Sequence, residues 1–269
     1  MSRQWAILLC CVVASMAPVG TTAAEASDPD QLVGMADSAF RQGDYPRAAQ
    51  LGRAAGTARG RTVAAWAGLV EGKFVAPSSE RMPDILRAEQ DARQALALDA
   101  ADVEGHLALV IALGFIGRQE GGVAAHFEGI AREARQHIDL ALALAPRNAW
   151  ANALLGGWNL EIVYDGGALG RQIYGASLQQ GIDAYGRALA IDPDNSPIAY
   201  QYALELLALD GASHHDRARR LLTDIVTRPP GDALDALIRV RAFAAMGALD
   251  ADDDDRVASL VREELGGPP

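Results

Sequence analysis

Three segments of the chain align with one another without gaps, and this internal repeat limits the possible folds more than any other feature. Each segment holds the end of one helical pattern, a turn containing Asp, Pro or Asn, and the start of the next pattern. The segments are ALALDAADVEGH (95–106), ALALAPRNAWAN (141–152) and ALAIDPDNSPIA (188–199), and their first residues lie 46 and 47 positions apart. A repeat period of about 20–50 residues is typical of arrays of stacked supersecondary units, so we expect such an array here.

The repeated units are expected to be helical. Apolar residues recur with helical spacing along the chain, alanine fills many of the remaining positions, and alternating strand patterns are nearly absent. Alanine has the highest intrinsic helix propensity, so the pattern predicts an all-α fold that is more than about 60 % helical, against about one third in typical globular proteins. The predicted helix pairs are 29–42 with 45–58, 63–76 with 85–99, 103–117 with 126–144, 149–163 with 177–191, 196–209 with 214–228, and 232–247 with 254–264.

The second helix of each pair carries small residues at fixed positions. Seven residues before the first alanine of each aligned segment stands another small residue, and a further position lies between the two. The flanking small residues are Ala88, Ala134 and Gly181, and the intervening ones are Ala92, Ile138 and Tyr185. Small residues at this spacing let two antiparallel helices approach closely, while larger apolar residues fill the groove between them.

This small–large–small pattern, the Asp192-Pro193 turn and the Gly43-Asp44-Tyr45 turn resemble those of the tetratricopeptide repeat family. The resemblance covers residues 29–264, although only the first unit has the family's usual length of about 34 residues. It implies an α-solenoid, a right-handed superhelix of antiparallel helix pairs. The concave side of such a superhelix presents the first helix of each pair.

The later units are longer than the family pattern, which predicts insertions between their two helices at 77–84, 118–125 and 164–176. Groove residues would then lie on the exposed faces of 63–76, 103–117 and 149–163. A helix hairpin needs only a few residues to turn, so an insertion is either tolerated or functional.

The longest insertion belongs to the stretch GWNLEIVYDGGALGRQIYGAS (157–177), which combines glycines with polar-tipped aromatic residues. Gly166-Gly167 and Gly170 are unfavourable in a helix, so we expect them to end the helix that precedes them. Amphipathic aromatic side chains favour binding surfaces, but they also fill the core of a hairpin that carries an insertion. The candidate partner- or ligand-binding residues are Trp158, Asn159, Glu161, Tyr164, Asp165, Arg171 and Tyr174.

A second, less specific resemblance rests on residues 134–195. The long first helix, the insertion and the return at Tyr174-Gly175-Ala176 are similar to the tetratricopeptide proteins that accompany periplasmic tripartite (TRAP) transporters, the T components. They are also similar to the helical regulators of microtubule dynamics. The first of these resemblances implies a small-molecule-binding accessory subunit of a transport system.

Residues 1–24 have the organisation of a secretory signal peptide. Arg3 precedes an apolar run at 5–13, and Thr22-Ala23-Ala24 offers small residues for cleavage, with a second possible site after Ala26. The run is shorter than the roughly 20 residues of a membrane span, although an uncleaved anchor is the alternative. Both cysteines, Cys10 and Cys11, lie in this segment, so the mature domain (25–269) would contain no disulfide and no thiolate site.

The charge of the chain excludes several partners. The whole sequence carries a formal net charge of −11, which repels nucleic acid and anionic lipid, and no apolar stretch in 25–269 is long enough to span a bilayer. The chain also lacks a glycine-rich phosphate loop, a serine nucleophile elbow and a paired-carboxylate motif. We therefore expect a non-enzyme without a cofactor, located in the periplasm or secreted.

Possible metal ligands are present, but their spacing is incomplete. Adjacent His214 and His215 point about 100° apart on a helix, and Glu133 with His137 lacks a second histidine. The acidic run at 250–255 lacks the glycine and glutamate of a calcium loop. His106 and His126 are isolated in the sequence. We expect no metal site.

The sequence thus predicts an exported scaffold that binds a protein or peptide partner through its concave groove and the 157–177 segment. The alternative is the small-molecule-binding accessory subunit. A scaffold would present an open groove, whereas a carrier would enclose a pocket lined by aromatic residues.

Overall fold

The computed structural model describes residues 28–120, 129–209, 212–251 and 253–265. Helices make up 86 % of these residues, and none of them lies in a strand, so the predicted all-α class is confirmed for the described chain. Residues 1–24 with the predicted signal peptide, both cysteines, His126 and Asp252 lie outside the described residues. No helix in the described ranges has the length and apolar character needed to cross a membrane.

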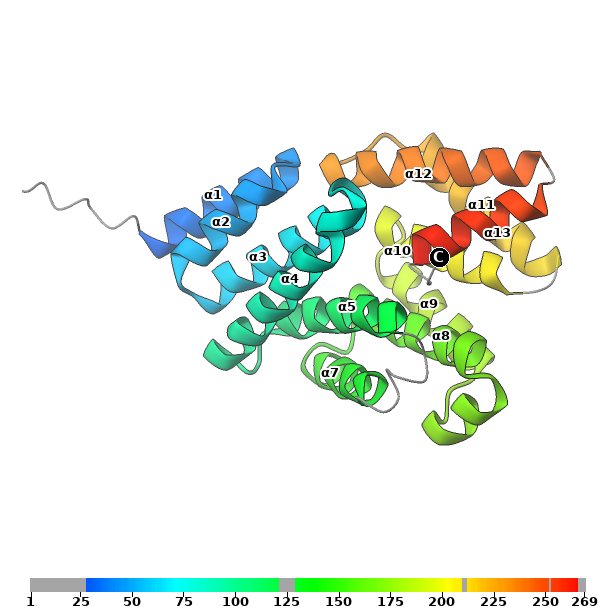
Figure 1. Cartoon of the computed structure of the whole chain (residues 1–269), viewed down its shortest axis with the longest axis horizontal. Helices are drawn as coiled ribbons and strands as arrows, with labels where there is room; N and C mark the ends of the chain where they lie inside the picture. Colours follow the sequence, from blue (N-terminus) through cyan, green and yellow to red (C-terminus); the bar gives the residue numbers. More distant parts are fainter. Residues whose placement is uncertain (1–27, 121–128, 210–211, 252, 266–269) are drawn as a thin grey trace, which may run out of the picture.

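The helices follow one another with short connections (Figure 1). Their bounds are α1 Pro29–Gln42, α2 Tyr45–Ala55, α3 Ala58–Val70, the π-helical turn η1 Glu71–Val75, α4 Ser78–Leu98, α5 Val103–Glu120, α7 Ile130–Leu144, α8 Ala149–Tyr174, α9 Leu178–Ile191, α10 Ser196–Ala208, α11 Ala212–Thr227, α12 Ala233–Asp250 and α13 Asp254–Leu265.

Side-chain caps explain where several helices begin. The side chains of Thr57, Asn148 and Asn195 accept hydrogen bonds from main-chain amides at the starts of α3, α8 and α10. Such caps satisfy amides that have no partner within the helix. At the end of α1, Gly43 adopts a left-handed conformation with φ of 84°, which a glycine accommodates without strain. The predicted tight turn of the first hairpin is therefore present.

The positions singled out by the repeat form the contacts between helices. The flanking Ala88, Ala134 and Gly181 and the intervening Ala92, Ile138 and Tyr185 are all buried. Close packing occurs between α8 and α9, where a Cβ added to Gly156 would lie 2.6 Å from the ring of Tyr185. Glycine at this position is what allows the aromatic ring to lie directly on α8. Tyr185 also stacks on Tyr202 of α10, at 4.4 Å between ring centroids.

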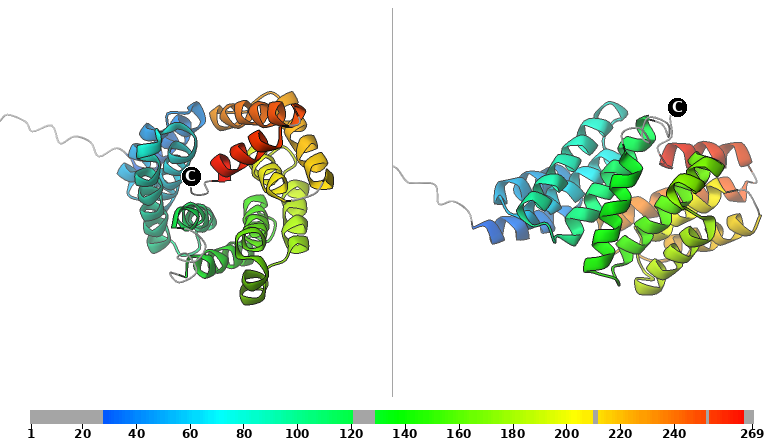
Figure 2. Two further views of the ribbon diagram at one scale, coloured as in Figure 1. Left: turned by 45° about the vertical axis from the view of Figure 1, so that its right-hand side comes forward. Right: turned by 90° about the horizontal axis from the view of Figure 1, so that it is seen from below.

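The two ends of the helical array meet, so that the helices curve around an inner side (Figure 2). α12 contacts α1, and a Cβ added to Gly43 would lie 2.9 Å from Cβ of Ala233. Leu234 and Leu237 of α12 pack against the apolar cluster of α1–α3. The last helix, α13, lies on the inner side and contacts α10 and α12.

The inserted segments differ from the prediction because they are largely helical. α4 begins at Ser78, so most of 77–84 belongs to that helix. α8 extends to Tyr174 instead of ending before the glycines, although Gly167 interrupts it with φ of 55° and ψ of −145°. The prediction that the glycines end the preceding helix agrees with the break at Gly167, but the short helical segment that follows was not predicted. Residues 121–125 of the middle insertion lie outside the described chain.

Candidate functional site

The seven candidate residues of the 157–177 stretch separate into different environments. Trp158 is 8 % exposed and belongs to the apolar cluster of α3–α8. Its Nε1 donates a hydrogen bond of 2.8 Å to the carbonyl of Ala131, and its ring meets Tyr174 edge-on at 6.0 Å. The guanidinium of Arg135 lies 5.0 Å from the same ring. Trp158 and Tyr174 thus brace the helical segment that follows Gly167 against the body of the protein.

Asn159 has an internal structural contact. It is 1 % exposed, its Nδ2 donates to the carbonyl of Leu155 at 2.9 Å, and its Oδ1 accepts from the amide of Ser177 at 3.1 Å. The side chain therefore ties α8 to the residue that caps α9, and both ends of its amide are used within the fold.

The segment 164–174, which we call the arm, projects from the other helices at the lower right of Figure 1. It exposes three large apolar side chains: Tyr164 at 57 %, Leu169 at 66 % and Ile173 at 48 %. Leu169 and Ile173 are four residues apart after the bend at Gly167, which places them on one helical face. Arg171 is also exposed on this segment. The arm is the exposed part of the predicted site.

The remaining candidates are two carboxylates, the half-buried Glu161 and the exposed Asp165 of the arm. Glu161 of α8 forms an ion pair with Arg118 of α5. Burial raises the pKa of Glu161, while Arg118 opposes that rise. Desolvation likewise raises the pKa of Asp165, one turn further along, again against the effect of Arg118. The predicted 157–177 cluster thus contributes the carboxylate of Glu161 to an interior charged group as well as side chains to the core.

The centre of this interior group is Lys73, which the sequence analysis did not single out. Lys73 is the only lysine among the 24 lysine and arginine residues of the chain. Its Nζ lies 5.8 Å and 5.4 Å from the ring centroids of Phe74 and Phe115, donates to the carbonyl of Glu264, and is 3.9 Å from Oε2 of that residue. The pKa of Lys73 is lowered to about 7, mainly by burial; Glu264 opposes this shift, and the nearby Arg118, Arg241 and Arg81 contribute to it.

Arg241 of α12 completes the contact between the two ends of the array. Its Nη2 donates to the carbonyl of Phe74 at 3.0 Å, and its guanidinium lies 5.0 Å from the Phe74 ring. Its Nε is 3.6 Å from Oε1 of Glu264. Tyr200 of α10, which is 2 % exposed, lies near the same carboxylate, and burial followed by the charge of Glu264 raises its pKa. We call Lys73, Arg241, Tyr200 and Glu264 the interior seam.

Glu205 of α10 is a second buried carboxylate on the inner side. It is 2 % exposed and accepts a hydrogen bond of 3.0 Å from Gln201. Burial raises its pKa to about 8, with Glu161 adding to the rise. Its Oε1 would lie 4.0 Å from a Cβ placed on Gly157, and the hydroxyl of Tyr185 would lie 3.1 Å from it. The Gly156-Gly157 pair was therefore the sequence signal for a close polar approach at this point.

The interior charges come mainly from the first helices of the predicted pairs. Lys73 follows α3 within the predicted 63–76, and Glu161 lies within 149–163. Arg118 lies one residue beyond the predicted 103–117. The sequence analysis did not predict this charged group because Lys73, Arg118 and Glu161 lie far from one another in the sequence.

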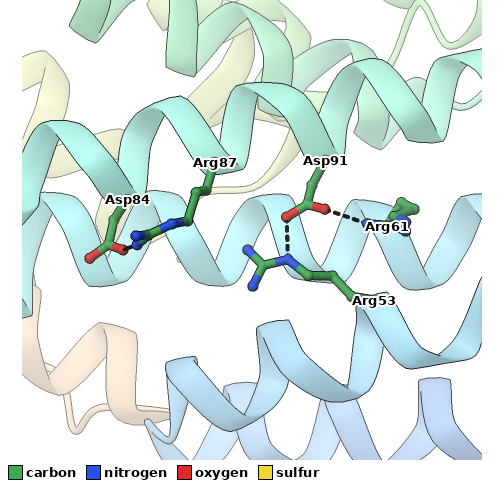
Figure 3. A network of polar contacts seen from close by, with 5 residues as sticks. All are labelled: Arg53, Arg61, Asp84, Arg87 and Asp91. Carbon is green, nitrogen blue, oxygen red and sulfur yellow. Dashed lines mark hydrogen bonds and ion pairs between the residues drawn. The ribbon is translucent and has the colours of Figure 1, made fainter.

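Asp91 is another buried carboxylate, and both of its oxygens form ion pairs (Figure 3). Asp91 of α4 is 3 % exposed. Its two oxygens accept from Nε of Arg53 at 2.8 Å and from Nη1 of Arg61 at 2.9 Å. The carboxylate thus joins α2, α3 and α4, and its contacts are structural.

The histidines require one correction. His106, interpreted as isolated, lies beside His137, with 2.7 Å between the two Nδ1 atoms. Nε2 of His106 is 3.1 Å from the carbonyl of Ala100, so it carries a proton and leaves Nδ1 to accept from His137. Burial, then the proximity of His106, lowers the pKa of His137. Within the described residues, no group of three or more His, Cys, Asp and Glu side chains could hold a metal ion.

A cavity of about 250 Å³ lies among α7, α8 and α9. Its lining residues are Arg135, Leu155, Asn159, Gln180, Asp183 and Arg187. Arg187 donates to Asn152 at 3.1 Å and Arg135 to Asp139 at 2.9 Å, so both cations are engaged by the protein itself. No aromatic residue lines this cavity, unlike the enclosed aromatic pocket expected of a carrier.

No model of a known protein family matches the chain. The search of curated proteins gives no match either. The function is therefore argued from the residues and their geometry alone.

Proposed function

We propose that the protein is an exported, non-catalytic scaffold of the tetratricopeptide type that binds a partner protein, with the arm as its main contact surface. The observation that carries the proposal is the exposure of Tyr164 just before Gly167 and of Leu169 and Ile173 on the helical segment after it. Contiguous exposed apolar side chains mark interaction sites, and a few such residues supply most of the binding energy in an interface.

The repeat architecture supports this proposal. Successive helices pack on their neighbours along the chain, and the repeated small residues are buried at each contact. In an α-solenoid each unit gains its stability from its neighbours and leaves a large surface for partners. We place the protein in the periplasm or outside the cell because residues 1–24 have the organisation of a cleaved signal peptide. Intact-mass measurement of protein from its native host tests this: a mass that retains residues 1–24 contradicts export by cleavage.

The small-molecule alternative has less support. The cavity among α7, α8 and α9 is about 250 Å³, below the roughly 300–1,000 Å³ typical of ligand sites, and its arginines are already paired. The exposed arm has no corresponding role in an accessory subunit that only encloses a small ligand. We therefore favour a protein partner.

The experiment compares two surface variants as baits for proteins of the native host's periplasm. Leu169→Ser with Ile173→Ser should remove the partner, because it replaces the apolar face of the arm with polar groups. The matched control is Leu98→Ser, since Leu98 is 60 % exposed at the end of α4, on another helix. For the partner captured by the wild type, calorimetry should show an affinity at least about 30-fold weaker in the arm variant, corresponding to about 2 kcal/mol. Equal affinities of the arm variant and the control would refute the arm as the contact surface.

A further inference from the structure

Two histidines far apart in the sequence meet between α5 and α7, which pack against each other. The Nδ1 atoms of His106 and His137 are 2.7 Å apart, and the centroids of the two rings are 5.0 Å apart. At this nitrogen separation, 5.0 Å is close to the largest distance that two imidazole centroids can have, so each Nδ1 points toward the other. The two rings are therefore joined by a direct hydrogen bond between their Nδ1 atoms.

The main-chain carbonyl of Ala100 determines where the protons of this pair lie. A carbonyl oxygen only accepts, so Nε2 of His106, at 3.1 Å, carries a proton, and Nδ1 of the neutral ring is an acceptor. Nδ1 of His137 is then the donor, which leaves Nε2 of His137 as the remaining basic nitrogen of the pair. A first added proton can bind to that nitrogen without disturbing the contact, and it makes the hydrogen bond between the rings charge-assisted.

A second added proton has a different effect, because the nitrogen left to bind it is Nδ1 of His106. That nitrogen would then face the N–H group of His137 with no acceptor between them. His106 is 3 % exposed, so the added charge would also be buried. Unpaired donors and buried charges are both unfavourable in a protein interior, and separation of α5 from α7 at this point relieves them.

The charged groups that face His137 come from α4 and α7. Glu133, one turn before His137 on α7, favours protonation of the imidazole, whereas Arg93 of α4 disfavours it. Arg93 and Glu133 form an ion pair of 2.7 Å with each other. The carboxylate that could stabilise a charged imidazole is therefore already shared with a guanidinium.

The groups that α3 and α8 direct toward the start of α5 are also engaged. Thr62 of α3 donates to Asp102, the carboxylate just before α5, and Asn148 before α8 donates to Glu104 at 3.4 Å. The apolar cluster next to the pair contains Leu107, Ala141 and Ala151 from α5, α7 and α8. A second proton on the histidine pair thus adds charge beside apolar side chains and carboxylates that already accept hydrogen bonds.

We propose that His106 and His137 form a proton-sensitive latch between α5 and α7, which tolerates one added proton and opens when both rings are protonated. Burial, then the proximity of His106, lowers the pKa of His137 from its ordinary value of 6.5. The unfolded chain therefore binds more protons than the folded pair below about pH 6.5, and the stability of the contact falls as the pH decreases. The latch does not depend on the arm or on its partner.

Nitrogen-15 NMR of the full chain with labelled histidine tests the proton count directly. A through-bond coupling between the two Nδ1 nuclei reports the hydrogen bond between the rings. The coupling should be present at pH 7.5, persist when Nε2 of His137 takes its proton, and disappear in a second step at lower pH. A coupling that is absent at pH 7.5, is lost with the first proton, or remains when both rings are protonated would overturn the latch.

Amide exchange, corrected for the intrinsic rate at each pH, measures the opening. Between pH 7 and pH 4.5 the protection of 130–144 should fall at least about tenfold more than that of 212–227, because the latch opens locally. His106→Asn keeps an acceptor oxygen near the position of Nδ1 that cannot take a proton, so it should remove this difference. The matched control is His215→Asn on α11, which should keep the difference seen in the wild type.

Two results of the exchange experiment would overturn the proposal. One is an equal loss of protection in 130–144 and 212–227 of the wild type, and the other is the same pH dependence in His106→Asn and His215→Asn. If His106→Asn does not fold, as circular dichroism would show, the coupling in the wild-type chain decides. The arm variant Leu169→Ser with Ile173→Ser should keep the pH dependence of the latch, so failure of the latch and failure of the arm as a contact surface are separate outcomes.

Discussion

The carboxylates of Asp91 and Glu264 each lie beside two cations, but the distances to those cations differ. Asp91 accepts two hydrogen bonds shorter than 3.0 Å from Arg53 and Arg61 (Figure 3). The carboxylate oxygens of Glu264 lie 3.6 Å and 3.9 Å from the nitrogens of its two cations, although Lys73 also donates to the main-chain carbonyl of Glu264. The first contact joins three consecutive helices, whereas the second joins the last helix to elements from both ends of the array.

This difference indicates which contacts hold the fold and which can be exchanged. A buried charge that loses a close partner leaves an uncompensated ion, so the Asp91 contact resists change. A buried lysine can instead lose its proton when its partner leaves, and the pKa of Lys73 is already lowered to about 7 by burial. Lys73 can therefore lose its charge near neutral pH when Glu264 is removed, whereas the guanidinium of Arg241 stays charged.

The largest expected effect is at Asp91. Asp91→Ala should lower the free energy of unfolding by about 3 kcal/mol, because Arg53 and Arg61 would then face each other without a carboxylate. Asp84→Ala provides the control in the same helix: Arg87, its partner at 2.9 Å, is 58 % exposed, and such a surface pair contributes about 0–1 kcal/mol. Urea unfolding followed by circular dichroism measures both. Similar losses of unfolding free energy in the two variants would show that the buried Asp91 contact stabilises the fold no more than the surface pair of Asp84 and Arg87.

An intermediate effect is expected from Glu205, and it depends on pH. Burial raises the pKa of Glu205 to about 8 from an unfolded value near 4.5, so the folded state holds the proton across this window. The contribution of Glu205 to stability therefore falls as pH rises from about 4.5 to about 8. Glu205→Gln removes this dependence, and relative to the wild type it should be more stable at pH 8 than at pH 5 by about 1 kcal/mol or more. Unfolding free energies of both proteins at the two pH values would show a constant difference if Glu205 is ionised in the fold.

Much of the fold could be predicted from the sequence because the repeat is local. The buried positions of α4, α7 and α9 follow from small residues seven apart, and the starts of α8 and α10 follow from capping asparagines in the aligned turns. The path of α8 after Ile162 was harder to predict. Gly167 alone takes a left-handed conformation there, while Gly166 and Gly170 remain helical, and the choice depends on packing between Trp158 and Tyr174.

The interior seam could not be predicted because its residues are distant in the sequence. Lys73 and Glu264 are 191 positions apart, and nothing in either local pattern indicates the other. The closure of the array, which brings α12 against α1, decides their contact. One signal was nevertheless present: a single lysine in a chain that otherwise uses arginine marks a position where a compact ammonium differs from a guanidinium. The candidate residues of 157–177 were similarly divided between core, arm and interior by a helical path that local glycines do not specify.

The smallest expected effect on stability is at Glu264. Glu264→Gln should lower the free energy of unfolding at pH 8 by less than about 1 kcal/mol, because its ion pairs are long and partly solvated, with side chains 13–25 % exposed at Lys73, Glu264 and Arg241. Near this pH Lys73 can shed its proton and so avoid the cost of an unpaired buried charge. At pH 5 Lys73 stays charged, so the loss should be larger than at pH 8. The measurement is urea unfolding at both pH values beside Glu263→Gln, which should resemble the wild type at each. A loss of unfolding free energy near 3 kcal/mol at pH 8, equal to that of Asp91→Ala, would contradict this prediction. It would show that the interior seam stabilises the fold as much as the Asp91 contact does and that α13 is a fixed part of the fold.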